Sequence, residues 1–467
     1  MKTALVWFRN DLRIHDHEPL SKALKDADQV ICFYCFDSNY WREDKFGHLK
    51  CNGFRTQFLR ESVSGLSDAL KALGGKLTVR SGNTAEALYN LYQECPFDAV
   101  YFTDEHTEEE KTIEKSARAK LESQVTWHGS ETLTLFHRED LPMAVEELPD
   151  VFTAFRKKVE KYAHVRETYP TPESISCPDI KDDGTVPDWA WFGMEEPSKD
   201  HRAVLDFKGG EQAALERLDY YFWETEKLKY YKETRNGLVG ADYSSKFSAW
   251  LGNGSISPRK IYWEVQRFEE SITKNSSTYW LVFELIWRDF FRFHALKYNN
   301  DIFMAGGIRD ELPQMPFDED KFEAWKQAGT GIPFIDANMK ELKLTGYMSN
   351  RGRQNVASYL VKDLEIDWRY GASWFESQLV DYDVCSNWCN WNYVSGVGTD
   401  PRKERYFNII KQANGYDGDG EYVKLWLPEL KPLIKEHVHQ PYLFKSQYPE
   451  LEIKYKKPLY TSPRWKN

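Results

Sequence analysis

The chain has 467 residues, of which 41% are hydrophobic and 29% charged, and its net charge is −11. Such a length allows two or three domains with sizeable cores, whereas no apolar run approaches the roughly 20 residues of a membrane span, so we predict no membrane partner. The acidic balance taken alone argues against a nucleic-acid partner, although one local basic surface can dominate binding in an acidic protein.

Short apolar runs alternate with helical patterns over the first 130 residues. Continuous apolar strands with helical crossovers predict a parallel sheet that is covered on both faces, and we assign residues 1–135 to this α/β domain. The architecture is of a nucleotide-binding kind, but no G-x-G-x-x-G follows the first strand and no P-loop is present. We expect strands at 3–8, 29–36, 76–80, 97–103 and 124–128, and helices near 18–26, 52–73, 84–94 and 107–122.

The seven cysteines are an odd number and form no secreted-type framework of disulfides. Cys32 and Cys35 have the spacing of a redox pair, but they lie in a strand-like run whose alternation sends the two thiols to opposite faces. A redox pair of the thioredoxin type begins a helix, so we interpret these cysteines as buried thiols. Because a strand-like run follows the N-terminus without a basic leader, we predict a cytoplasmic protein.

A change of composition separates the first domain from the rest of the chain. Residues 165–210 are rich in proline, acidic residues and glycine, which is typical of an interdomain connection, and we place the connector at 136–210. From 211 to 467 the helical period prevails, which predicts an all-α domain. Within it, Ser257 followed by Pro258 predicts a helix cap and the first turn of a helix.

The heptapeptide D-Y-S-S-K-F-S occupies residues 242–248. Its three serine hydroxyls and the backbone amides beside them are able to cradle a diphosphate without a glycine-rich loop. The alternative is an ordinary hydroxyl-rich helix cap.

An apolar helix is predicted over residues 279–293. Glu284, Trp287 and Arg288 fall at i, i+3 and i+4 and therefore share one face of it. One interpretation is a partly buried structural salt bridge. The functional interpretation places Glu284 and Trp287 at the wall of a substrate cavity and turns Arg288 toward a cofactor.

The stretch from Met348 to Tyr393 combines fixed cations, carboxylates and amides. Asn350 and Arg353 lie one turn apart at the start of a predicted helix, so both reach one edge of a ligand. Asp381 and Asp383 alternate, and Asn387 follows Asp383 by four residues. Asp383 suits a ring imide or a ribose, and Asn387 suits a ring nitrogen. The alternative for the two aspartates is a metal site or a helix cap, but no further acidic cluster completes a metal shell, so we predict no metal.

The order and spacing of these motifs over residues 231–408 resemble those of the photolyase/cryptochrome family. The opening V-W-F-R-N-D-L-R-I-H-D-H and the closing W-L-P-E-L at 426–430 fit too, so the resemblance covers nearly the whole chain. Gln354 and Tyr393 stand where the family's duplex photolyases carry Met and Trp, and with T-R-N-G-L at 234–238 they resemble the DASH branch. The resemblance implies a Rossmann-like α/β domain joined to a helical domain that binds FAD.

The same resemblance implies where FAD lies. Its diphosphate would be near residues 244–248, and its isoalloxazine ring would be near the fixed cations, carboxylates and amides. The implied cofactor-binding residues are Tyr231, Ser244, Ser245, Lys246, Phe247, Ser248, Glu284, Arg288, Asn350, Arg353, Asp381, Asp383 and Asn387.

The implied activity is light-driven: excited, reduced FAD donates an electron to a cyclobutane pyrimidine dimer, and the ring splits. By resemblance, Glu284 hydrogen-bonds the dimer, Trp287 and Tyr393 flank it, and Asn350 and Gln354 belong to the same catalytic set. The hard chemistry is the cofactor's, and the protein supplies position and electrostatics. The alternative is a blue-light photoreceptor that signals through a partner and repairs nothing.

The DASH resemblance also implies a preference for single-stranded DNA. Flipping a dimer out of a duplex costs a few kcal/mol, and the smaller Tyr393 and the polar Gln354 change the contacts that offset this cost. A lesion in a single strand escapes most of the cost, while backbone contacts and stacking persist. Our candidates for the phosphate contacts are Arg235, Arg402 and Lys403.

Two further expectations concern electrons and light. Trp391 and Trp368 match the two inner tryptophans of the family's electron chain, but the outer position is Met315, which puts the standard path in doubt unless Phe317 or a tyrosine bridges. A folate antenna, 5,10-methenyltetrahydrofolate, would lie between the domains. We place it near Glu105 or Glu108, for which the alternative is a merely solvated acidic loop.

Overall fold

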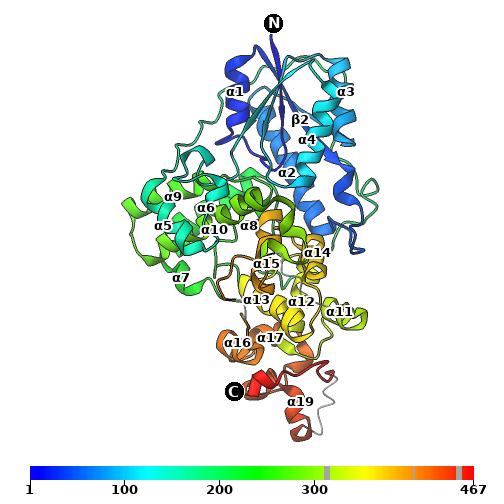
Figure 1. The fold of residues 1–467 in the computed structure, drawn as a ribbon, viewed down its shortest axis with the longest axis vertical. Coiled ribbons are helices and arrows are strands. Elements are labelled where there is room, and N and C mark those ends of the chain that lie inside the picture. The colour runs from blue at the N-terminus through cyan, green and yellow to red at the C-terminus, as the bar shows by residue number, and fades with distance from the viewer. Residues whose placement is uncertain (310–315, 403–404, 449–454, 467) are drawn as a thin grey trace.

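The first part of the chain forms a five-stranded sheet in the computed structural model, which describes residues 1–309, 316–402, 405–448 and 455–466 (Figure 1). All neighbouring strands are parallel, in the order β3-β2-β1-β4-β5. Every strand predicted from the sequence is present, and no end is displaced by more than two residues. The strands are β1 (Thr3–Trp7), β2 (Gln29–Asp37), β3 (Leu77–Gly82), β4 (Ala99–Thr103) and β5 (Thr126–Ser130).

Helices cover both faces of this sheet, which is why its strands are apolar on both sides. On one face lie α1 (Glu18–Asp26) and α2 (Gly53–Ala72), and on the other lie α3 (Thr84–Glu94) and α4 (Glu108–Leu121). Cys32 belongs to the first core and Cys35 to the second, and both are free and buried. The interpretation of these cysteines as buried thiols is therefore confirmed.

The segment that follows the sheet contains α5 (Phe152–Tyr162) and a long irregular stretch. This stretch packs back onto the sheet through backbone hydrogen bonds, for example from the Val30 amide to the Ser176 carbonyl at 2.8 Å. Ile175 and Phe192 are buried in the core beneath β2 and β3. A stretch that the composition marks as a connection is thus also part of the α/β core.

The rest of the chain is helical and lies below the sheet in Figure 1. Its largest helix, α10, is apolar on most sides because other helices surround it, and it contacts α7, α9 and α15. Among the helices of the described residues, none is long and apolar enough to cross a membrane. The helices are α6 (Glu211–Asp219), α7 (Tyr231–Thr234), α8 (Ser248–Gly252), α9 (Pro258–Ser271), α10 (Ser276–Tyr298), α11 (Glu319–Lys326), α12 (Pro333–Thr345), α13 (Asn350–Ser358), α14 (Trp368–Gln378), α15 (Val384–Ser395), α16 (Ile409–Tyr416), α17 (Glu421–Trp426), α18 (Lys435–Val438) and α19 (Pro441–Phe444).

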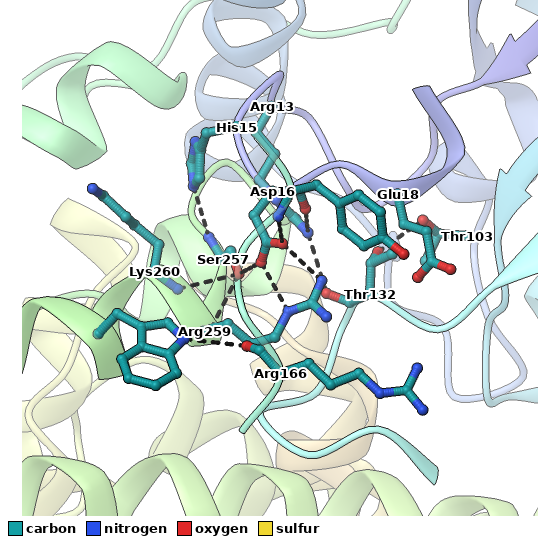
Figure 2. A network of polar contacts seen from close by, with 12 residues as sticks. Arg13, His15, Asp16, Glu18, Thr103, Thr132, Arg166, Ser257, Arg259 and Lys260 are labelled. Carbon is teal, nitrogen blue, oxygen red and sulfur yellow. Dashed lines mark hydrogen bonds and ion pairs between the residues drawn. The ribbon is translucent and has the colours of Figure 1, made fainter. Parts of the chain in front are cut away.

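A buried polar network joins the two parts (Figure 2). Asp16, in the loop after β1, accepts hydrogen bonds from Arg259 Nε at 2.9 Å and Nη2 at 2.8 Å, and from the Ser257 hydroxyl. Arg13 reaches in the same direction and donates to the Gly254 carbonyl at 2.8 Å. Because Ser257 also caps α9, the start of this helix is held directly against the α/β part.

Candidate functional site

A cavity of about 490 Å³ opens in the helical part, between α7, α8, α10, α13 and α15. It brings together residues that are far apart in the sequence, and most of the predicted site residues line it. Those that do are Tyr231, Arg235, Ser244, Ser245, Lys246, Phe247, Ser248, Glu284, Trp287, Arg288, Asn350, Arg353, Gln354, Asp381, Asp383 and Tyr393. Asn387 instead lines a smaller cavity of about 120 Å³, which shares Asn350, Arg353, Gln354, Asp381 and Asp383 with the first.

The serine-rich segment forms one end of the cavity. Arg217 holds its outer side by donating to the carbonyls of Ser244 at 3.2 Å and Ser245 at 3.1 Å. Lys246 has a φ of +64° and the following Phe247 is right-handed, which is the alternation that gathers backbone N–H groups into an anion-binding nest. Among the described residues, the buried amino group of Lys246 has no hydrogen-bond partner, but it lies over the ring of Tyr243, and burial lowers its pKa well below the usual value. An anionic group placed here would meet the nest of backbone N–H groups.

The face of α10 that carries Glu284 forms a second wall. Glu284 pairs with Arg235 at 2.7 Å, whereas Arg288 turns away and donates to the carbonyl of Leu251 at 2.9 Å. The intrahelical salt bridge that we considered is therefore not formed. Burial raises the pKa of Glu284, although Arg235 opposes this. Trp287 stacks on Phe152 at 3.6 Å between ring centroids.

A cluster of charges lies deeper, where α10 meets α15. Asp383 caps α15 by accepting from the Ser386 amide at 2.9 Å, and it also accepts from Arg292 at 2.6 Å and Arg288 at 3.3 Å. Burial alone would raise the pKa of Asp383, but the two arginines outweigh it and hold the pKa below its usual value. Arg292 was missed by the sequence analysis, although its place four residues after Arg288 puts it on the same face of α10. Among the described residues, its Nε and Nη1 have no hydrogen-bond partner.

The first turn of α13 supplies the third wall. Ser349 caps this helix by accepting from the Gly352 amide at 3.0 Å, which orders Asn350 and Arg353. Arg353 Nη2 donates to both oxygens of Asp381, at 2.9 and 2.8 Å. Asp381 therefore forms an ion pair with Arg353, and the two residues, which are both implied to bind the cofactor, lie side by side.

Asn387 is buried at the base of the smaller cavity. Its side-chain nitrogen donates to the Ala372 carbonyl at 3.0 Å, which fixes the orientation of the amide. The amide oxygen is left available to accept a hydrogen bond from a ligand. The expected place of this amide beside a ring nitrogen stays a prediction.

A second cavity of about 590 Å³ lies between the α/β and helical parts. Glu105 and Glu108 both line it, but they differ: Glu105 is buried and accepts from Asn10 at 2.8 Å, whereas Glu108 is exposed. Aromatic side chains from both parts complete its walls, namely Tyr34, Tyr40, Phe46, Tyr382 and Trp388. Such a cavity accepts a flat, largely apolar molecule.

The candidate phosphate contacts are placed differently from one another. Arg235 lies inside the first cavity, where it pairs with Glu284. Arg402 has an exposed side chain 3.4 Å from Asp400, and Lys403 lies outside the described residues. Two arginines that the sequence analysis missed, Arg351 and Arg405, line the same cavity. Arg405 follows a loop with no periodic pattern, so no local signal identified it.

The two tryptophans expected to carry electrons are buried in different surroundings. Trp391 lines the smaller cavity beside Asn387 and contacts Trp325 at 6.4 Å between ring centroids. Trp368 contacts Trp388 at 5.8 Å. Met315 lies outside the described residues. Phe317, named as a possible bridge, stacks on Tyr370 at 4.0 Å.

Comparisons with known proteins match both parts of the chain. Residues 4–174 match the family model for DNA photolyase, and residues 280–463 match the one for the FAD binding domain of DNA photolyase. A relative from Gloeobacter violaceus, named cryptochrome DASH, is 50% identical over 444 residues, which cover 94% of this chain and 88% of the relative.

Solved structures extend the agreement to the whole fold. The crystal structure of a cryptochrome from Synechocystis is 47% identical, with a TM-score of 0.95, and the match covers 99% of this chain and 97% of that one. An archaeal photolyase from Sulfolobus tokodaii, solved with two FAD molecules, is 28% identical with a TM-score of 0.80, covering 98% and 96%.

Proposed function

This chain belongs to the cryptochrome DASH branch of the photolyase/cryptochrome family, and we propose that it repairs cyclobutane pyrimidine dimers under blue light, preferring those in single-stranded DNA. One observation carries the proposal. Glu284, Trp287 and Tyr393 line the same cavity as the residues expected to hold FAD. A lesion that contacts these three side chains would therefore lie in the same cavity as the cofactor.

The matched FAD-binding domain makes FAD the cofactor of the helical part, and the residues present fit it. The nest at Lys246 and Phe247 suits the diphosphate. Asp383 remains ionised and accepts an N–H, and Asn387 presents an amide oxygen at the base of the smaller cavity. When bound and excited by light, the cofactor supplies the electron that splits the dimer.

Glu284 contacts the dimer in this proposal. Because burial raises its pKa, Glu284 is protonated more readily than an exposed glutamate, and a protonated carboxyl donates a hydrogen bond to a pyrimidine carbonyl. Arg235, 2.7 Å away, orients the carboxyl group. Trp287 and Tyr393 meet edge to face, with centroids 6.0 Å apart, and offer aromatic surfaces to the two bases. Asn350 and Gln354 complete the polar lining.

The preference for a single strand follows from what offsets the cost of flipping. Tyr393 is engaged by Arg405, whose Nη2 donates to its hydroxyl at 3.0 Å, so part of this aromatic surface is already in use. The Gln354 side-chain oxygen likewise accepts a hydrogen bond from Arg351 at 2.9 Å, so it is already engaged within the protein. Fewer groups are then left to offset the few kcal/mol that extrusion from a duplex costs. A flexible single strand needs no such compensation.

For the second cavity we propose an antenna chromophore, 5,10-methenyltetrahydrofolate. The aromatic walls suit its rings, and the buried Glu105 accepts an N–H from its pterin. Because the relative from Sulfolobus tokodaii was solved with two FAD molecules, a second flavin is the competing occupant. An absorption spectrum of the purified protein separates the two, since folate adds a near-ultraviolet band and a second flavin doubles the flavin absorbance per chain. For the chain itself we propose a cytoplasmic location, which its free thiols suit.

The test compares matched single- and double-stranded oligonucleotides that carry one dimer, with dimer loss measured under blue light. We expect repair of the single strand to exceed repair of the duplex, and binding to weaken with salt because phosphate contacts release counterions. Glu284→Ala should lower the yield of repair more than the affinity for DNA. Equal repair of both substrates contradicts the strand preference, and repair of neither favours a photoreceptor.

A further inference from the structure

In the segment between α15 and α16, successive side chains lie alternately inside and outside the substrate cavity. Arg405 and Phe407 line the substrate cavity, whereas Tyr406 and Asn408, between and after them, do not. In an extended backbone successive side chains point to opposite sides, which explains this alternation. Whatever holds Tyr406 and Asn408 therefore also sets where Arg405 and Phe407 lie.

The C-terminal residues hold this opposite side. The indole N–H of Trp465 donates to the Tyr406 hydroxyl at 2.7 Å, and that hydroxyl donates to Asp363 at 3.0 Å. Asn408 donates to the Arg464 carbonyl at 2.9 Å. Trp465 itself is only 9% exposed, and it stacks on Tyr359, so its position is fixed by the core of the helical part.

The cavity side of the same segment touches the aromatic wall. Arg405 Nη2 donates to the Tyr393 hydroxyl at 3.0 Å, and its guanidinium carbon lies 4.9 Å from the centre of the Tyr393 ring. Tyr393 in turn packs edge to face on Trp287. A continuous set of contacts thus joins Trp465 to the side chains that flank the substrate.

We propose that Trp465 is a positioning residue for substrate binding: through Tyr406 it holds Arg405 and Phe407 in the cavity, although it touches neither cofactor nor substrate. This inference rests on the proposed function, because it assumes that the cavity receives a dimer in DNA. It assigns the C-terminal residues a part in recognising the lesion. The predicted consequence of losing the link is weaker binding of damaged DNA, with FAD content unchanged.

The test replaces Trp465 by Phe, which keeps a ring on Tyr359 but removes the N–H. We expect affinity for a dimer-containing single strand, measured by fluorescence anisotropy, to fall about three- to tenfold, the effect of one buried hydrogen bond. The repair yield at saturating DNA should stay as in wild type. Tyr406→Phe removes the same link from the other side and should act alike, so the test survives if one variant folds poorly.

Tyr455→Phe is the matched control. It also removes one hydrogen bond of the C-terminal residues, but the bond goes to Asp336, which keeps donors from Thr330 and Gly331. This variant should bind damaged DNA within twofold of wild type.

A double-mutant cycle separates positioning from general destabilisation. In an Arg405→Ala background, Trp465→Phe should change affinity by less than about twofold, because the group that it positions is gone. An undiminished effect in that background overturns the proposal, and so does wild-type affinity in Trp465→Phe. If wild type itself does not distinguish damaged from undamaged DNA, the proposed function fails instead.

Discussion

Two arginine–aspartate clusters of this protein have similar chemistry but differ in how many of their polar groups have hydrogen-bond partners. At the junction of the two parts, the oxygens of Asp16 accept from Arg259, Ser257 and the Tyr169 amide, and Asp16 and Arg259 are both buried. Beside the second cavity, which it lines, Arg292 pairs with Asp383, yet among the described residues two of its nitrogens have no hydrogen-bond partner.

The difference teaches how to tell a structural cluster from a ligand site. Buried polar groups are nearly always hydrogen-bonded, so a buried cation with unused donors points to a missing acceptor. Asp16 and Arg259 need no further partner and hold the two parts together, although the buried Nε of Arg13 beside them has no hydrogen-bond partner among the described residues. Among the described residues, Arg292 keeps unused donors beside the second cavity, which marks that region as a place where a ligand completes the bonding.

The largest expected effect comes from breaking the saturated cluster. Asp16→Ala leaves Arg259 buried and uncompensated, and we expect the free energy of unfolding to fall by about 3–5 kcal/mol. Because no ligand is involved, the loss should be the same with and without FAD. Denaturant unfolding of the two forms measures this. A loss of stability that occurs only in the FAD-loaded form would contradict the interpretation of the Asp16 cluster as purely structural.

The buried carboxyl of Glu341 should show itself in the pH dependence of stability. Burial raises the pKa of Glu341, which lies near Lys246, to about 7. Between the unfolded pKa of 4.5 and about 7 the folded state holds a proton that the unfolded state has lost, so stability falls as pH rises through this window. In the apoprotein, the free energy of unfolding should fall by at most about 3 kcal/mol across this window, and Glu341→Gln should abolish this fall. An identical pH profile for variant and wild type would exclude this contribution.

Binding of FAD provides the third test. Asp383→Asn keeps the shape of the side chain but removes the charge that two arginines neutralise. We expect the affinity for FAD, measured by flavin fluorescence, to fall by about 1.5–3 kcal/mol, the range for hydrogen bonds to charged groups. Asp16→Asn is the control and should bind FAD as wild type does.

The smallest effects should come from two helix caps. Ser257 and Ser349 each accept a hydrogen bond from a first-turn amide, of α9 and of α13 respectively. Ser349→Ala should cost about 1 kcal/mol of stability, and Ser257→Ala should cost more, because its hydroxyl also donates to the buried Asp16. Only Ser349→Ala should also weaken FAD binding, because α13 carries Asn350 and Arg353. Equal FAD affinity in both variants would show that the cap does not order these residues.

The sequence predicts the α/β part closely because its signals are local. The run from Gln29 to Asp37 is apolar throughout, and Ser257 followed by Pro258 marks the start of α9. Many site residues were also predicted, since hydroxyls, cations and amides at fixed spacing carry chemical meaning. These predictions depended only on the residues within one helix, strand or loop, and not on the elements that pack against it.

Pairings between distant segments were not predicted in the same way. Glu284 has Arg288 one turn away, yet it pairs with Arg235, which directly follows α7, because tertiary packing decides which cation it meets. Arg405 reaches Tyr393 from a loop without periodicity. The role of Arg292 as the nearer partner of Asp383 depends on how α10 crosses α15, which no local pattern specifies.

Gly254 limits which chimeras can be built from this protein and its relatives. It has a φ of +71°, and a Cβ added there would lie 1.9 Å from the Asn10 carbonyl oxygen, which belongs to the other part of the molecule. A side chain at this position would push the two parts away from each other. Chimeras that graft the α/β part of one relative onto the helical part of another should therefore assemble only where glycine occupies this position, whatever residues line their cavities.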